Sequence, residues 1–265
     1  MEDDEWFVLM VVLLFGGIGW YHWLALTVQV SALGSRVLDR LVLLLLPVGL
    51  GWMLTLVMRQ LADIYVQTYV IYQVFYVVMG LTWAIGIAGI LPWLMGIGQR
   101  EDVLERRNSA ALPALCGALI GGTFTFAGAN IGDGPGWWVV VFCSLLSTGT
   151  WLALWLWGES RFGWRDAIVI DRDPATSWRL AGLLVGSGLI LGGSVAGDWE
   201  GTTEAIASWL WLGSLVIPLG VVAWMMEPRL QLSKGQSSRP ALDCGILPGG
   251  LYVVLAMALL SWVGG

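Results

Sequence analysis

Carboxylates are the side chains in this sequence that could attract a charged solute. Four of them fall in two predicted loops. These four are Asp133, Asp198, Glu200 and Glu204. Acidic groups that gather at one mouth of a membrane protein attract cations. A plainer interpretation is that acids are tolerated wherever arginines are excluded, and the sequence by itself favours it. The four residues are therefore a candidate acidic mouth, with no reaction assigned to them.

The single histidine, His22, is the other residue that could bind a group, since one imidazole can ligate the central metal of a haem or pigment. It lies within Trp20–Trp23, near a predicted membrane interface where amphipathic rings gather. We prefer the interfacial interpretation. The three cysteines, Cys116, Cys143 and Cys244, have neither disulfide nor zinc spacing. We expect no cofactor and no metal.

Catalytic groupings are not evident. We find no paired carboxylates, nucleophile–base pair, phosphate loop or metal-spaced cluster, so we expect no enzyme. No acid or base falls well inside a predicted span, which argues against a proton relay and against coupled transport. The polar residues inside the apolar runs should hydrogen-bond between helices or to their own backbone. They are Gln73, Thr82, Thr123, Thr125, Asn130, Ser144, Ser147, Thr148 and Thr150.

The elements that position these residues are predicted to be membrane-spanning helices. Hydrophobic residues make up 57% of the 265-residue chain and charged residues 12%, against about 25% charged in a soluble domain. Nearly charge-free runs of about 20 residues recur along the chain, as in spanning helices. They predict one all-α polytopic integral membrane domain over residues 1–265. Its eight spans are Trp6–Thr27, Leu41–Met58, Tyr69–Ile97, Ala110–Ile131, Trp137–Trp157, Leu180–Gly197, Ala205–Met226 and Ile246–Val263.

Three further features of these spans are predicted: the fate of the first span, the shape of the third and the positions of the tryptophans. The acidic start, Met1–Glu5, lacks the positive region of a signal peptide, so the first span should remain in the mature protein. The third span is long enough to tilt, to break near Pro92 or to carry an interfacial extension. Most of the 18 tryptophans are expected at the two interfaces. Trp52 and Trp151 lie deeper and should pack between helices.

The basic residues predict the orientation of the chain. Loops on one side hold 12 of the 13 basic residues, and the opposite side holds only Arg59. Short loops with this bias face the cytoplasm, so both termini should lie outside. The 12 residues are Arg36, Arg40, Arg100, Arg106, Arg107, Arg161, Arg165, Arg172, Arg179, Arg229, Lys234 and Arg239. The acidic net charge of −6 gives no reason to expect nucleic-acid binding.

An internal repeat organises the second half of the chain. Arg107–Asp133 recurs 65 residues later as Arg172–Asp198, with 9 of 27 aligned positions identical, most of them glycines and boundary charges. Each copy begins a two-span unit, so the copies should point the same way through the bilayer, as parallel repeats. The predicted divisions are an N-terminal two-span extension (1–68), the long third span and its loop (69–106), two repeat units (107–159 and 172–227) and a C-terminal span (246–263).

The repeat keeps residues that set geometry. Asn108 and Asp173 precede the first span of each unit and are strong N-cap residues. Anion binding at these helix starts is the alternative role. Glycines at four-residue spacing share a helix face and permit close backbone approach, so the fourth and sixth spans should cross. A glycine-lined pore is the alternative. The candidate packing glycines are Gly117, Gly121, Gly128, Gly182, Gly186 and Gly193.

A family resemblance rests on the pattern N-x-A-A-x-x-x-x-x-G-x-L-x-G. It is carried by Asn108, Ala110, Ala111, Gly117, Leu119 and Gly121. The pattern resembles the bacterial membrane proteins of domain-of-unknown-function family 350, in which a two-span unit occurs in pairs. The resemblance covers about residues 69–226. The second copy departs from it, with Asp173 in place of Asn and Thr176 in place of the second Ala. It implies an inner-membrane protein without assigned activity or catalytic residues, linked to membrane stress.

These observations favour a non-catalytic membrane protein that acts as a scaffold or accessory subunit, in a homo-oligomer or with other membrane-protein subunits. Its remaining partners would be membrane lipids. A passive channel or facilitator for an ion or small solute is the alternative, since hydroxyl groups and backbone carbonyls alone can line a path. The expected location is the bacterial inner membrane.

Overall fold

The structure is a computed structural model that describes residues 1–29, 36–230 and 240–264. In these stretches the chain is all-α, with no β-strand beyond one isolated bridge. Eight helical segments are long and apolar enough to cross a membrane, which confirms the predicted fold class and span number. They are Asp3–Gln29, Val37–Gln60, Val70–Leu94, Ala111–Gly128, Trp137–Phe162, Pro174–Gly193, Thr202–Leu230 and Leu242–Val263.

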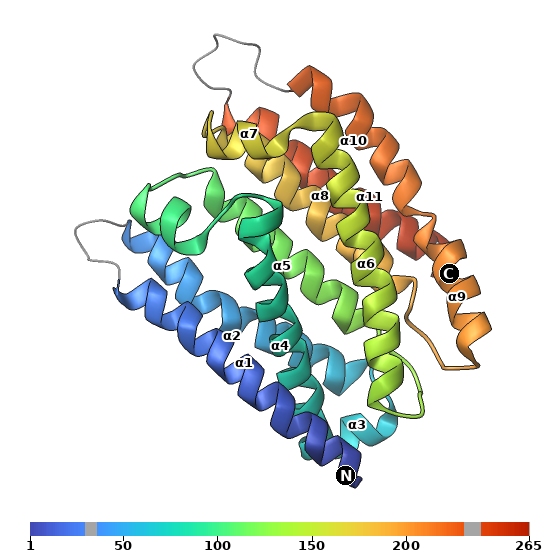
Figure 1. Ribbon diagram of the computed structural model, residues 1–265. Coiled ribbons are helices and arrows are strands. Elements are labelled where there is room, and N and C mark those ends of the chain that lie inside the picture. Colours follow the sequence, from blue (N-terminus) through green and yellow to red (C-terminus); the bar gives the residue numbers. More distant parts are fainter. Residues whose placement is uncertain (30–35, 231–239, 265) are drawn as a thin grey trace.

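The helices follow one another in a simple order (Figure 1). The first half contains α1 (Asp3–Gln29), α2 (Val37–Gln60), the short α3 (Ile64–Thr68), α4 (Val70–Leu94) and the π-helical turn η1 (Gln99–Glu105). The second half contains α5 (Ala111–Gly128), α6 (Trp137–Phe162), the short α7 (Trp164–Val169), α8 (Pro174–Gly193), α9 (Thr202–Gly213), α10 (Val216–Leu230), the π-helical turn η2 (Leu242–Ile246) and α11 (Leu247–Gly264).

Proline affects the third and seventh spans differently. α4 runs through Pro92 and ends at Leu94, so the third span is one continuous helix. The seventh span is divided between α9 and α10. Proline has no N–H, so Pro218 cannot donate to the carbonyl of Ser214, and that carbonyl accepts from Ile217 N–H instead at 2.9 Å.

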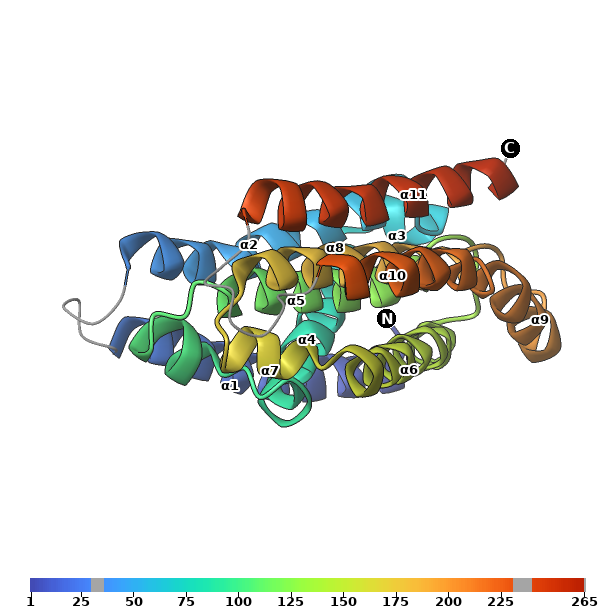
Figure 2. The ribbon, with the colours of Figure 1, turned by 90° about the horizontal axis from the view of Figure 1, so that it is seen from above.

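α5 and α8 occupy the centre of the bundle. Most residues of both helices are buried, whereas α1, α2, α10 and α11 leave one side exposed. α4 and α2 pack against α5, α11 and α10 pack against α8, and α6 contacts both central helices. Figure 2 shows α11 on one side of this central pair and α1 on the other.

Glycines bring the backbones of the central helices into contact. A Cβ at Gly117, Gly121 or Gly128 would overlap the backbone of Ala181, Leu184 or Gly192 on α8, respectively. The glycine spacing predicted that the fourth and sixth spans cross, and they do. Three other predicted glycines face α11. A Cβ at Gly182 would overlap the backbone of Gly249, one at Gly186 would lie 2.9 Å from the Tyr252 carbonyl oxygen, and one at Gly193 would lie 2.8 Å from Leu260.

The two central helices run in the same direction, as parallel repeats require. Near their starts the Ala114 N–H donates to Ser177 Oγ at 3.0 Å, and near their ends Gly128 meets Gly192. Positions 65 residues apart also share backbone conformations. Arg107 and Arg172 have φ of 52° and 55°, and both are left-handed. The described residues contain three such pairs of positive-φ residues: Arg107/Arg172, Gly132/Gly197 and Gly136/Gly201.

Charged residues gather at the two ends of the bundle. Glu5 and Asp63 lie with the loops between α5 and α6 and between α8 and α9 at one end, called here the acidic end. The basic end carries η1, α7 and the helix ends around Arg36, Arg100 and Arg161. Lys234 and Arg239 lie outside the described residues. Both termini lie toward the acidic end, since Glu5 lines its cavity and Leu260 packs against Gly193 at the end of α8.

Candidate binding site at the acidic end

A cavity of about 610 Å³ opens at the acidic end. Its walls come from α1, the turn between α2 and α3, α3 itself, α4, the α5–α6 loop, α6, the α8–α9 loop and α9. We call it the acidic cavity. The four acids that the sequence placed at an outer mouth all line it, together with two others. The six carboxylates are those of Glu5, Asp63, Asp133, Asp198, Glu200 and Glu204.

Backbone hydrogen bonds align three short segments at the bottom of this cavity. Gly132 N–H donates to the Leu61 carbonyl at 3.2 Å, which forms a parallel bridge between Ala62 and Gly132. Gly197 N–H donates to the Ile131 carbonyl at 2.8 Å. The left-handed φ of Gly132 (97°) and Gly197 (124°) is a conformation that glycine adopts without strain. The segments 61–63, 131–133 and 197–199 therefore lie side by side, and each contributes one aspartate.

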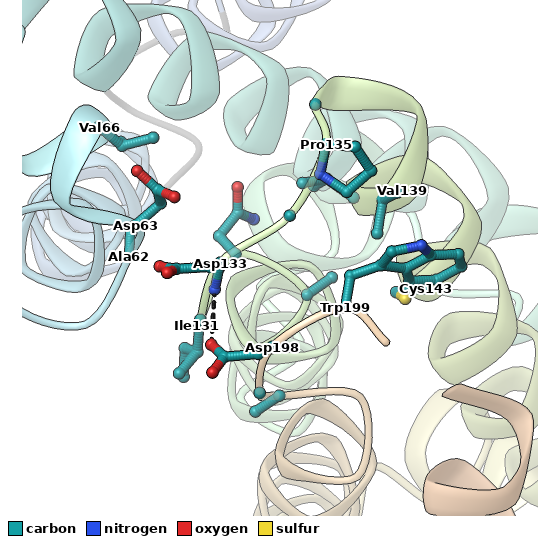
Figure 3. A pocket seen from close by; sticks show the side chains of 18 of the residues that line it. Ala62, Asp63, Val66, Ile131, Asp133, Pro135, Val139, Cys143, Asp198 and Trp199 are labelled. Atoms are coloured by element: carbon teal, nitrogen blue, oxygen red, sulfur yellow. Dashed lines mark hydrogen bonds between the residues drawn. The ribbon is translucent and has the colours of Figure 1, made fainter. Parts of the chain in front are cut away.

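Asp133 interacts with each of the other two aspartates (Figure 3). Asp198 Oδ1 accepts the Asp133 N–H at 2.8 Å, and the Trp199 N–H donates to the Asp133 carbonyl at 2.7 Å. The Asp133 carboxylate faces that of Asp63. The negative charge of Asp63 is the main cause that raises the pKa of Asp133, followed by burial, the charge of Asp198 and a hydrogen bond with the Asp63 carboxyl. Two facing carboxylates repel unless a proton or a cation lies between them.

One buried amide adds an unused acceptor to the same cavity. Asn130 lines the acidic cavity and is only 6% exposed. Its Nδ2 donates to the Phe126 carbonyl at 2.8 Å, which holds the side chain at the end of α5. Its Oδ1 has no hydrogen-bond partner within the described part of the chain. A buried acceptor without a donor costs free energy, so its position is informative.

Hydroxyl groups lie between α5 and α6, deeper in the bundle than Asn130 and Cys143, which line the acidic cavity. Thr125 Oγ1 and Thr148 Oγ1 are hydrogen-bonded at 2.6 Å, and Trp83 Nε1 donates to Thr148 Oγ1 at 3.0 Å. Beyond them the interior is filled by apolar side chains, among them Leu119 and Trp151. The polar groups therefore end inside the bundle, and a hydrophobic cluster separates them from the basic end.

Trp52 and Trp151 differ in how deeply they are buried. Trp151 is buried and donates through Nε1 to the Leu184 carbonyl at 3.0 Å, so it packs between helices as expected. The same prediction for Trp52 is wrong, because its side chain is 65% exposed. It lies on the face of α2 that points away from the bundle, where an apolar ring would contact lipid.

No acid or base falls well inside a predicted span, but the structure buries an ion pair near the ends of two spans. Arg179 and Glu227 are fully buried, with Arg179 Nε 3.1 Å from Glu227 Oε1. The sixth span begins at Pro174 rather than Leu180, which places Arg179 within α8. Glu227 lies in α10, one residue beyond the predicted end of the seventh span. The pair forms because packing of α8 against α10 brings two span ends together.

The surrounding groups satisfy this ion pair. Arg179 also donates to the Cys244 carbonyl and, at 2.8 Å, to Thr176 Oγ1. Glu227 accepts from Trp164 Nε1 at 3.3 Å and from the Tyr252 hydroxyl at 3.5 Å. The network joins α7, α8, α10 and α11. Since its members are already paired, we assign it a structural role.

The two predicted cap residues, Asn108 and Asp173, accept hydrogen bonds from backbone N–H groups. Asp173 accepts the N–H groups of Ala175 and Thr176 at 3.1 Å each, as an N-cap of α8. Asn108 Oδ1 accepts Ala110 N–H at 3.0 Å in the corresponding turn, although α5 itself begins at Ala111. Both side chains are buried, so neither is presented to a ligand.

His22 is exposed on α1 and lines a second cavity of about 580 Å³ near η1, with Gln99 and Arg100. Within residues 1–29, 36–230 and 240–264, no group of three or more histidine, cysteine, aspartate or glutamate side chains is placed to hold a metal ion. The structure therefore brings the predicted acids together and leaves His22 apart from them.

The fold defines a multi-span α-helical membrane protein with an acidic cavity at one end. Comparison with protein-family models, with curated proteins and with solved structures found no match to this chain. The resemblance to family 350 therefore continues to rest on the motif residues alone.

Proposed function

We propose that this chain is a non-catalytic membrane protein that works by assembling with other membrane helices, as a homo-oligomer or as an accessory subunit. The observation that carries the proposal is a set of glycines on exposed helix faces. A Cβ at any of them would meet no other atom within 4 Å: Gly17, Gly49, Gly86, Gly89, Gly149 and Gly250.

These glycines differ from those in the centre of the bundle. Glycine is disfavoured in a helix by about 1 kcal/mol relative to alanine. At Gly121 and its neighbours, close backbone contact within the chain offsets that cost. The exposed glycines make no such contact in the chain. In lipid, small residues on a helix face favour association because they let a second helix approach closely.

α4 offers the clearest surface for such a contact. Gly86, Gly89, Ile90 and Trp93 follow the i, i+3, i+4, i+7 spacing of one helix face. All four are exposed, and Trp93 reaches 86%. Two small residues beside two large apolar ones form a shallow surface into which another helix can fit. We propose this face of α4 as the first interface.

The test is the assembly state of the purified protein in native lipid. Native mass spectrometry should show more than one copy, or stable further subunits. The double change Gly86→Leu and Gly89→Leu should shift the population towards single chains, with folding preserved because the added side chains point into open space. Leu145→Phe, which adds bulk at an exposed position of α6 outside this set of glycines, is the control and should leave the assembly unchanged. A parent protein that stays single at every protein-to-lipid ratio, with no subunit attached, would refute the proposal.

The location is part of the proposal. The 12-to-1 division of basic residues supports a cytoplasmic basic end, with the acidic end and both termini outside. The bacterial inner membrane and the link to membrane stress are supported by the family resemblance alone.

A passive facilitator is the second candidate, and the acidic cavity favours it. The hydrogen-bonded hydroxyls of Thr125 and Thr148 lie deeper in the bundle than this cavity and could extend a polar path. The apolar cluster around Trp151 closes the rest of the path, so conduction needs a further conformation. Selective flux in liposomes, lost in the double variant Asp133→Asn and Asp198→Asn, would favour the facilitator over the assembly proposal. Tight liposomes would favour assembly.

A further inference from the structure

We propose that the acidic cavity is a binding site for an organic cation with more than one ammonium group, a linear polyamine in chemical terms. Asp63 and Asp133 are its main anchor. This inference concerns a ligand site and does not depend on how the chain assembles. Four observations support it: the charge of the lining, the facing carboxylates, the unused acceptor of Asn130 and the aromatic residues in the walls.

The lining carries only one sign of charge. Six carboxylates from four separate segments line the cavity, and none of the described residues that line it is basic. Arginine and lysine are the usual partners of grouped carboxylates, because like charges held together repel. A cation that enters from solution relieves this repulsion. The focused negative field of such a cavity also raises the local concentration of cations.

The backbone holds the anchor residues together. Asp63 and Asp133 each follow a residue of the Ala62–Gly132 bridge, so the fold places their carboxylates side by side whether or not they repel. Asp63 is also fixed by its own hydrogen bond, as the N-cap that accepts Tyr65 N–H. An ammonium group can donate to two carboxylates at once, since it has three N–H donors.

Asn130 supplies an independent sign of a ligand. Asn130 lines the cavity, and its Oδ1 is buried and has no donor within the described residues. Carboxylates alone would be satisfied by protons or by any cation. A neutral buried oxygen is satisfied by a hydrogen-bond donor, and an ammonium group provides one.

The walls favour an organic ligand. Tyr65, Tyr72 and Trp199 line the cavity beside the acids. Aromatic faces attract ammonium groups through their quadrupole and pack against methylene groups as well. The volume of about 610 Å³ falls within the range of about 300–1,000 Å³ that is usual for sites of small organic molecules.

A bare divalent metal ion fits less well. Calcium takes about six to eight oxygen ligands at close range, whereas the described residues contain no convergent group of three acidic, histidine or cysteine side chains. The six carboxylates are instead distributed around a wide cavity. A chain of methylene groups with ammonium groups at intervals can reach several of them at once.

Calorimetric titration of the purified protein in lipid nanodiscs with spermidine tests the site. We expect saturable binding that weakens as salt is raised, because the attraction is largely electrostatic. A diol of similar length should not bind. Asp133→Asn and Asn130→Leu should each reduce the affinity about tenfold or more, the usual effect of losing a hydrogen bond to a charged group. Asp166→Asn, an exposed acid of α7 at the basic end, is the matched control and should change nothing.

Other outcomes would overturn the site. These are no binding of spermidine by the parent protein, equal binding by the parent and Asp133→Asn, or an equal loss in Asp166→Asn. Magnesium ions that displace spermidine at equal concentration would show a metal site in its place. Because Asp133→Asn removes a repulsive charge, thermal unfolding should show a folded variant. If Asp133→Asn does not fold, two other results test the site. Glu204→Gln, at the edge of the same cavity, should weaken the binding of spermidine, and the parent protein should bind spermidine but not the diol. Failure of either result would overturn the site.

Discussion

Arg179 and Glu227 form an ion pair that is fully buried between α8 and α10. Each stands at the end of an apolar run, where a charge is usual at the membrane surface. Only the packing of α8 against α10 and α11 shows that they meet inside the protein. Burying two charges costs several kcal/mol, which mutual attraction and further hydrogen bonds must offset. The four additional partners of this pair provide those bonds.

Breaking this pair should destabilise the protein strongly. Glu227→Gln leaves the guanidinium of Arg179 buried without a counter-charge, and we expect a loss of about 3–5 kcal/mol in unfolding free energy. Denaturation in mixed micelles measures it. The double variant Arg179→Leu and Glu227→Leu should be closer to the parent than Glu227→Gln, because it leaves no unpaired charge. Single and double losses that simply add would show that the two residues are not coupled.

Replacing Asp133 should stabilise the folded protein, whereas replacing Glu227 should destabilise it. Its raised pKa means that the folded protein binds a proton more readily than the unfolded chain does, whose carboxyl titrates near 3.8. This group therefore adds stability as pH falls from above its raised pKa towards 3.8, and the gain is lost as pH rises again. Asp133→Asn should raise the melting temperature near pH 8 and remove this part of the pH dependence. Thermal unfolding of the parent and variant at pH 8 and pH 5 is the measurement. A lower melting temperature of the variant at pH 8 would contradict the repulsion between Asp63 and Asp133.

At the scale of the helix, the sequence predicted which face of a helix packs closely. It did not predict which distant segments of the chain come into contact. The spacing of Gly117 and Gly121 is a property of one helix, so it indicated the α5–α8 contact directly. The same reasoning did not distinguish the partner of Gly186, which is α11, because a glycine face does not specify which helix covers it. The bridge between Ala62 and Gly132 joins two loops far apart in the chain. The pairing of two loops leaves no periodic pattern in the sequence. The sequence therefore predicted that the acids gather at one mouth, but not that Asp63 and Asp133 face each other.

The central glycines should be intolerant of larger residues. Gly121→Leu places a Cβ against the Leu184 carbonyl, and Gly186→Leu places one against the Tyr252 carbonyl. Backbone atoms of packed helices cannot move aside as a flexible side chain can. We expect a loss of about 1–3 kcal/mol or more, or a reduced yield of folded protein. Gly149→Leu, whose added atoms meet open space, is the control and should fold normally. If Gly121→Leu and Gly149→Leu are equally stable, the close approach of α5 and α8 is not as described.

At the scale of the whole molecule, the fold separates its charges into two opposite ends with an apolar band between them. The acids of the acidic cavity come from parts of the chain as far apart as Glu5 and Glu204. Helices that alternate in direction bring every second loop to the same end, so the composition of the loops determines the character of each end. Hydropathy and loop charge therefore predicted the two ends before any helix was placed in space.

Orientation is tested by labelling single cysteines in intact cells. All three native cysteines, Cys116, Cys143 and Cys244, would first be replaced to give a background without thiols. Asp3→Cys and Glu200→Cys introduce thiols at exposed positions of the acidic end, and Glu101→Cys and Asp166→Cys do so at the basic end. A membrane-impermeant maleimide should label the first pair in intact cells and the second pair only after permeabilisation, because loops rich in arginine are retained in the cytoplasm. The reverse pattern would place the acidic cavity in the cytoplasm, and any polyamine would then reach it from inside the cell.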